Sequence, residues 1–109
     1  MKKDDKVYLH HILDAIKNIE DFTEGLNKEK FLKSKLIQDG VLRNLEIIGE
    51  ATKQLSEEFK DSNADIEWKK IAGMRDILIH NYLGVDIEIV WGVIENRLSD
   101  LSKKVSKFI

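Results

Sequence analysis

Apolar residues recur at steps of three and four along most of this 109-residue chain, the spacing that places them on one face of an α-helix. Proline is absent, and the six glycines are scattered along the chain. Strand-rich sandwiches and barrels need frequent turn residues, so this composition argues against them. We therefore predict an all-α fold.

Two long helical regions occupy the first half of the chain. The first covers residues 7–22, with Asp4 or Asp5 available as its N-cap. The second begins after Asn27, which can cap it, and Gly40 is a potential break inside it. The apolar stripes that define these regions are Tyr8, Ile12, Ala15, Ile16 and Ile19 in the first, and Val41, Leu45, Ile48 and Leu55 in the second.

The second half of the chain contains two further helical regions. One starts at Trp68 and can end at Gly84 in a left-handed conformation, and the last follows Asp86 as its cap. The last helix carries an apolar seam formed by Ile87, Trp91, Ile94, Leu98, Leu101 and Val105. Because the helices are joined by short connections, we predict an antiparallel up-and-down bundle of four to five helices. We expect residues 1–109 to form a single domain.

The composition excludes several classes of site. Without cysteine the chain has no disulfide, thiolate zinc site or cysteine nucleophile. His10 and His11 point about 100° apart on a helix and cannot chelate one metal ion together. We therefore predict no metal site and no cofactor. The apolar runs are short and the N-terminal "MKKDDK" is highly charged, so we expect no membrane contact and a cytoplasmic location.

The net charge of −2 gives no global attraction to nucleic acid. Any contact with a phosphate backbone has to come from a local basic surface. Lys69 and Lys70, the segment "KEKFLKSK" and Arg43 are the cations that the sequence offers for this role.

The segment "RDILIH" at residues 75–80 is the strongest candidate for chemistry. Asp76 and His80 are one helical turn apart, so the carboxylate can hydrogen-bond a ring nitrogen, fix the tautomer and favour the imidazolium. Arg75 and Tyr82 lie two turns apart on a different flank of the same helix. These two pairs are the candidate site residues.

His80 lies five positions after Arg75. On an ideal helix this separation places the two side chains about 140° apart around the axis, so they diverge. The long arginine side chain can sweep round, the helix can loosen as it approaches Gly84, or two chains can each contribute to a shared site. We favour the last two together.

Arginine and histidine suit the cleavage of RNA phosphodiesters. The 2′-hydroxyl attacks the adjacent phosphorus, and a histidine with an ordinary pKa of about 6.5 removes or supplies a proton near neutrality. The guanidinium of Arg75 can hold two phosphoryl oxygens as negative charge builds. Tyr82 can stack on a base. The alternative without chemistry is that Asp76 and His80 form an ordinary exposed pair on the helix surface. Such a pair stabilises a helix by about 0.3–0.5 kcal/mol.

The sequence "RDILIHNY" resembles the R-x-x-x-x-H-x-Y signature of the HepT-like toxins, small ribonucleases of the HEPN superfamily. The resemblance extends to "RNLEIIGEA" at 43–51, to "WKKIAGMRDILIHNYLGVD" at 68–86 and to the following "IVWGVIE". These blocks stand in the family's order and cover nearly the whole chain. One departure is the absence of a proline shortly before Trp68.

The resemblance implies a HEPN helical bundle that forms a homodimer, with Arg75 and His80 of both chains facing a cleft at the interface. It implies metal-independent RNA endonuclease activity in a type VII-like toxin-antitoxin system. The expected partner is a minimal nucleotidyltransferase antitoxin, similar to MntA, which AMPylates the tyrosine that corresponds to Tyr82. Phosphate charge beside Arg75 would then neutralise the guanidinium.

Two other functions are consistent with the same residues. The chain can be a non-catalytic helical module that scaffolds a nucleotidyltransferase or presents a substrate to it, which predicts complex formation without ribonuclease activity. Arg75 and His80 can also be polar residues of a dimer interface, which predicts that their replacement changes the oligomeric state first.

Overall fold

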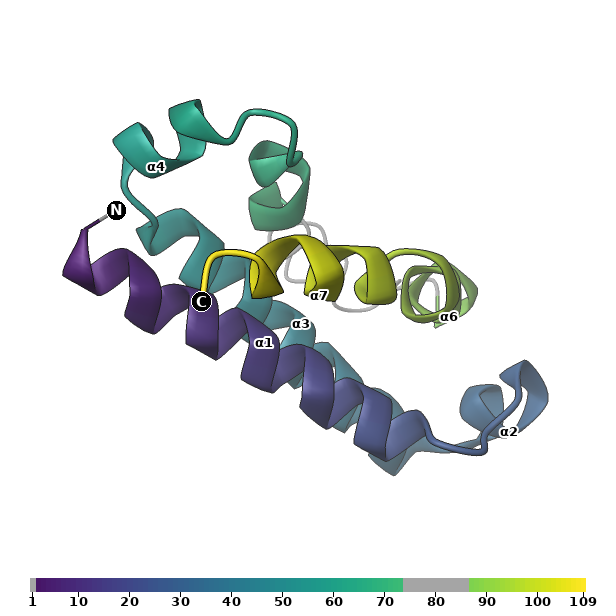
Figure 1. The fold of residues 1–109 in the computed structure, drawn as a ribbon. Coiled ribbons are helices and arrows are strands. Elements are labelled where there is room, and N and C mark those ends of the chain that lie inside the picture. Colours follow the sequence, from purple (N-terminus) through teal and green to yellow (C-terminus); the bar gives the residue numbers. More distant parts are fainter. Residues whose placement is uncertain (1, 74–86) are drawn as a thin grey trace.

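The computed structural model describes residues 2–73 and 87–109, and within them the only regular secondary structure is helical. The all-α prediction is therefore confirmed. The helices are α1 (Lys3–Thr23), α2 (Lys28–Lys33), α3 (Lys35–Gln54), α4 (Glu57–Ser62), α6 (Ile87–Asn96) and α7 (Leu98–Ser106), and residues 68–73 are also helical (Figure 1).

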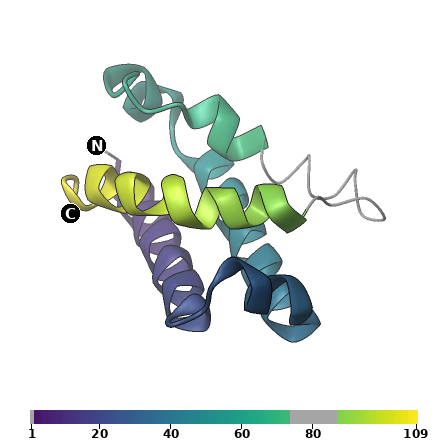
Figure 2. The same cartoon turned by 90° about the vertical axis from the view of Figure 1, so that its right-hand side faces the viewer.

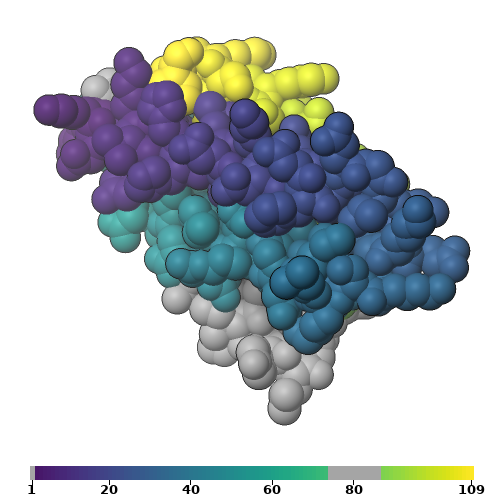
Figure 3. All heavy atoms as spheres, turned by 90° about the horizontal axis from the view of Figure 1, so that it is seen from below, coloured from purple at the N-terminus to yellow at the C-terminus, as the bar shows by residue number. Residues whose placement is uncertain are grey.

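The two longest helices, α1 and α3, lie side by side in opposite directions and form one continuous face of the molecule (Figures 1 and 3). α6 and α7 follow one another across this pair (Figure 2). The predicted apolar stripes supply much of the core, including Ile12, Ile16 and Ile19 of α1 and Val41, Leu45 and Ile48 of α3, all at most 1% exposed. The antiparallel pairing of the first two long helices is thus as predicted.

The second predicted helical region is interrupted at Ser34 and continues through Gly40. The Ser34 hydroxyl accepts a hydrogen bond from the Ile37 backbone N–H at 3.3 Å and so starts α3. The Gln38 side-chain amide donates to the Phe31 and Leu32 carbonyl oxygens at the end of α2. These bonds satisfy backbone groups on both sides of the break.

Gly40 instead allows a close approach between α1 and α3. A Cβ atom at this position would lie 3.1 Å from the Phe22 ring, closer than ordinary van der Waals contact. The glycine with a real conformational requirement is Gly25, whose φ of 75° turns the chain after α1. Asn27 then caps α2 as predicted, accepting from the Lys30 backbone N–H at 2.9 Å.

Asp5 links the start of α1 to the start of α4. The N-cap of α1 is Lys2, so the prediction of Asp4 or Asp5 for that position was wrong. The Asp5 carboxylate accepts hydrogen bonds from the Lys2 backbone N–H at 3.3 Å and from the Ser56 N–H and hydroxyl at 2.7 Å each. Ser56 is itself the N-cap of α4, so one carboxylate fixes two helix starts.

The last predicted helix is divided at Arg97 into α6 and α7. The φ of −121° at Arg97 departs from helical geometry, yet its N–H donates to Val93 and its carbonyl accepts from Leu101. The apolar seam survives the bend, because Trp91, Leu98, Leu101 and Val105 are buried. Among the described residues, no helix has the length and apolarity needed to cross a membrane.

Candidate active site

The four predicted site residues, Arg75, Asp76, His80 and Tyr82, lie in segment 74–86, outside the described residues. Gly84 and the predicted cap Asp86 lie there as well. The structure does show the helices that precede and follow this segment.

The helix that leads into the segment is anchored by Trp68 at its start. The indole is 6% exposed and packs against Phe59, with 5.8 Å between ring centroids. Its Nε1–H donates to the Asn63 carbonyl oxygen at 3.0 Å. The helical residues continue to Gly73, two positions before Arg75. A buried indole with a satisfied N–H therefore fixes the chain one to two turns before the candidate arginine.

The helix that follows the segment, α6, is anchored by Trp91. This side chain is 7% exposed and packs against Phe31 of α2 at a centroid distance of 5.2 Å. Glu88 pairs with Lys28 of α2 at 3.6 Å, across the same helix contact. Buried tryptophans therefore anchor the described helices that precede and follow the candidate segment.

A groove of about 790 Å³ separates the helix at 68–73 from α6 and α7. Its apolar surface includes Leu45 of α3, Ile71, Val90, Val93 and Leu101. Gly73 and Ile89, the latter 66% exposed, also line it, so the groove reaches the residues that border the candidate segment. This groove could not be predicted from the sequence, because its walls come from three separate stretches of the chain.

The groove's charged lining consists of three acids and three bases, Asp65, Glu67, Asp100, Lys70, Arg97 and Lys104. Lys70 pairs with Glu67 at 3.4 Å and Lys104 with Asp100 at 3.2 Å. The groove is therefore close to neutral, and its aliphatic walls suit protein better than a nucleobase, which prefers aromatic surfaces.

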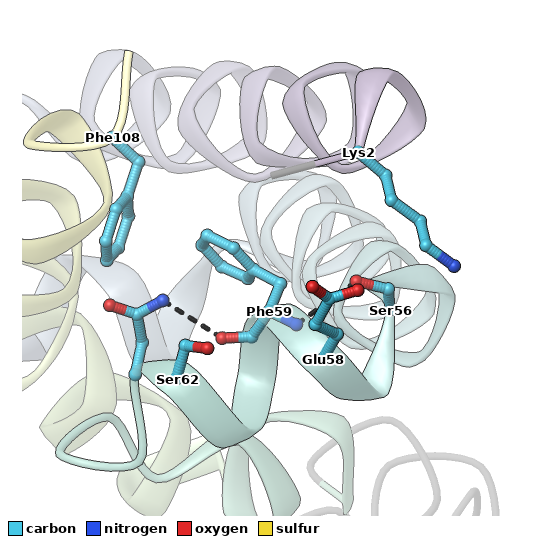
Figure 4. A pocket seen from close by; sticks show the side chains of 7 residues that line it. Lys2, Ser56, Glu58, Phe59, Ser62 and Phe108 are labelled. Carbon is cyan, nitrogen blue, oxygen red and sulfur yellow. Dashed lines mark hydrogen bonds between the residues drawn. The ribbon is translucent and has the colours of Figure 1, made fainter.

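A smaller hollow of about 270 Å³ lies between the start of α1, α4 and the C-terminal end of the chain. Figure 4 shows Phe59 between Phe108 and Lys2 in this hollow, and the two phenyl rings meet edge to face at 4.9 Å. Its Asn63 side-chain amide already donates to the Phe59 carbonyl oxygen at 2.9 Å. We assign this hollow a packing role.

Most of the cations that the sequence offered for RNA contact are paired with nearby acids. Lys33 lies 3.1 Å from Glu29, and Arg43 lies 3.3 Å from Glu46. Lys69 is exposed. In the part of the chain that the structure describes, no group of three or more histidine, aspartate or glutamate side chains is placed to hold a metal ion.

Comparison with known proteins identifies the family. The model of the family described as "Ribonuclease HepT-like" matches residues 12–108. A protein of Thermococcus cleftensis named "Probable ribonuclease HepT" is 43% identical over 107 residues, which cover 98% of this chain and 97% of that protein. The chain belongs to the HepT-like ribonuclease family.

Other HepT-like relatives differ in length. A Methanocaldococcus jannaschii protein named "Putative RNase" is 41% identical over 108 residues, covering 99% of this chain and 89% of the relative. A second protein of that organism, named "Gamma-glutamylcyclotransferase and putative RNase", is 44% identical over 109 residues. The chain spans about half the length of this last relative, 49%. No solved structure matches the chain.

The HepT-like match includes segment 74–86 and both of the helices that anchor it. The recognition made from "RDILIHNY" and its neighbouring blocks is therefore confirmed at the level of the family. The roles of Arg75, Asp76, His80 and Tyr82 stay predictions.

Proposed function

We propose that this chain is a toxin endoribonuclease that cleaves RNA without a metal ion. The observation that carries the proposal is the Arg75, His80 and Tyr82 spacing within a chain of the HepT-like ribonuclease family. The anchored helices on both sides support it, because a reacting pair has to be held in place by rigid elements. The proposed location is the cytoplasm.

In the proposed reaction, His80 acts as general acid or base and Arg75 stabilises the phosphoryl oxygens. The 2′-oxygen of the RNA bonds to phosphorus as its proton leaves, and the bond to the 5′-oxygen breaks as that oxygen gains a proton. The products are a 2′,3′-cyclic phosphate and a 5′-hydroxyl end. Asp76 orients His80, and Tyr82 contacts the substrate.

We further propose a homodimer in which two chains form the site together. The α6 half of the groove supports this interface, because it is apolar and borders the candidate segment. Gly92, inside α6, has nothing within 4 Å of the position that a Cβ would take. A glycine in a helix lowers its stability by about 1 kcal/mol relative to alanine. Close approach of a second chain's backbone would explain why a glycine stands at this position.

Cleavage by the purified, unmodified protein should proceed at the same rate with and without EDTA. The reason is that the proposed protons and charge stabilisation come from His80 and Arg75. A single-turnover assay on mixed-sequence RNA, with detection of 2′,3′-cyclic phosphate ends, measures this. A rate that falls with EDTA and recovers with Mg²⁺ would contradict metal independence. Stable binding of a nucleotidyltransferase without any cleavage would favour the scaffold module instead.

Co-expression with a cognate nucleotidyltransferase antitoxin should add one or more AMP units to the chain at Tyr82. The phosphate charge would compete for Arg75 and exclude the RNA backbone. Intact-mass measurement followed by peptide mapping tests this, and Tyr82→Phe is the matched control that should remain unmodified. An unmodified wild-type chain, or modification at Tyr8 in place of Tyr82, would remove this regulation from the proposal.

A further inference from the structure

α7 and the residue before it carry an excess of positive charge. Between residues 97 and 107 there are four cations, Arg97, Lys103, Lys104 and Lys107, and a single acid, Asp100. This stretch has a net charge of +3 in a chain whose total is −2, so the other residues together carry −5. The chain is therefore acidic in net charge but contains a locally basic surface at residues 97–107.

Three of the four cations share one side of α7. At 100° per residue, Lys103, Lys104 and Lys107 fall within an arc of about 100°, and Arg97 stands at the bend directly before α7. The buried residues Leu98, Leu101 and Val105 occupy a different arc. We call the set of Arg97, Lys103, Lys104 and Lys107 the α7 cationic face.

Three of these cations keep their charge available. Lys104 pairs with Asp100 at 3.2 Å. Arg97, Lys103 and Lys107 are exposed, and none of them makes an ion pair with a residue in the described ranges. This contrasts with α2 and the start of α3, where Lys33 and Lys35 each have an acid within 3.1 Å on the same helix.

The α7 cationic face adjoins the groove that reaches the candidate segment. Arg97 and Lys104 line that groove, which also contains the acids Asp65, Glu67 and Asp100. The acids of α6 lie elsewhere: Glu88 pairs with Lys28 of α2, and Glu95 is seven positions further on nearly the same face.

The face is also long enough for several phosphates. Ten residues separate Arg97 from Lys107, which is about 15 Å along a helix. α6 covers a similar length between the candidate segment and Arg97, and Figure 2 shows α6 and α7 in succession across the molecule.

We propose that the α7 cationic face binds the phosphate backbone of single-stranded RNA and so positions the substrate. Its exposed part carries charges and no aromatic or large apolar side chain, a chemistry that suits phosphates and gives no base-specific contact. Arg97, Lys103 and Lys107 are positioning residues in this proposal, which rests on the proposed ribonuclease function.

The test compares two triple variants that each remove three positive charges. The α7 variant is Arg97→Gln, Lys103→Gln, Lys107→Gln. The control is Lys3→Gln, Lys6→Gln, Lys17→Gln, which changes three exposed lysines on α1. The probe is a short 2′-O-methyl oligonucleotide, which binds without being cut, and the readout is fluorescence anisotropy over a range of salt concentrations. Melting temperatures verify that both variants fold.

The α7 variant should bind about tenfold more weakly at low salt, with a salt slope lower by about 2, because each single-strand phosphate contact contributes about 0.7. The control should stay near wild type. In cleavage assays the α7 variant should raise the half-saturating RNA concentration and leave the saturated rate unchanged.

Equal losses in the two variants, or a loss in the control alone, would overturn the proposal. Absence of any oligonucleotide binding by the wild type would overturn it as well. The ribonuclease function is judged separately by cleavage: a wild type that cuts RNA while both variants bind equally refutes only the α7 face. Binding that depends on α7 without any cleavage refutes only the ribonuclease. Loss of binding to an acidic protein partner, with RNA binding intact, would assign the face to that partner.

Discussion

His80→Ala is expected to lower single-turnover RNA cleavage by about 10²–10⁴-fold, the usual contribution of a positioned general acid or base. Arg75→Ala should lower it by about 10²–10³-fold, the range found when a group that stabilises transition-state charge is removed. At saturating RNA both losses should appear in the rate constant. The measurement is cleavage of a labelled RNA by each purified variant under identical conditions.

The control for these variants is thermal stability. Melting temperatures near that of the wild type would show that the lost activity reflects chemistry. His10→Ala, an exposed histidine on α1, is the matched replacement and should retain full activity. Retained cleavage in His80→Ala would end the assignment of this residue, and a change in oligomeric state in both variants would favour the dimer-interface alternative.

Mixing the two inactive variants tests whether the site is shared between chains. If Arg75 of one chain acts with His80 of the other, a mixed dimer contains one intact site. Random exchange should then restore about a quarter of wild-type activity, because half of the dimers are mixed and each has one working site of two. No recovery would indicate that both residues of a site come from one chain, and it would leave the individual roles of Arg75 and His80 unaffected.

The apolar periodicity was sufficient to predict the long helices, but not their breaks or the short helix α4. Ile12, Ile16, Val41 and Leu45 are buried as expected, since a repeat of three and four positions has one structural solution. The break at Ser34 depends on the Gln38 side chain reaching back to α2, a contact that spacing alone does not reveal. A glycine is a weaker signal, and Gly40 remains helical beneath the Phe22 ring.

The candidate site divides in a similar way. Arg75, Asp76, His80 and Tyr82 are recognisable because they lie close together in sequence, and their family is confirmed. The groove was not predicted, because its walls come from residues that are far apart in the chain. The α7 cationic face was not predicted either, because the structure is needed to show which cations are exposed and lack an ion pair among the described residues. The cations expected to bind RNA, such as Lys33 and Arg43, are instead paired with acids.

Asp5 shows the same limit in the core of the fold. Its partner Ser56 is 51 positions away, so the sequence suggested only a local cap for α1. The carboxylate is 2% exposed. Burial acts to raise the pKa of Asp5, but the hydrogen bonds from the Ser56 N–H and hydroxyl and from the Lys2 N–H, with the Lys2 charge, outweigh it. The pKa of Asp5 is therefore lowered below its ordinary value.

Asp5→Ala should lower the free energy of unfolding by about 2–3 kcal/mol at pH 7, because it leaves the Ser56 N–H and hydroxyl without their buried acceptor. Since the folded-state pKa is depressed, the stabilisation is present above the unfolded-state pKa of about 4 and is lost as the pH falls further. Urea unfolding at pH 7 and at about pH 3 should show the difference between wild type and variant shrinking in acid.

Asp4→Ala, an exposed neighbour in the same turn, should change stability by less than about 0.5 kcal/mol at either pH. A difference independent of pH would mean that Asp5 acts through packing, and equal effects of the two replacements would mean that α1 gains only a general benefit from negative charge at its start.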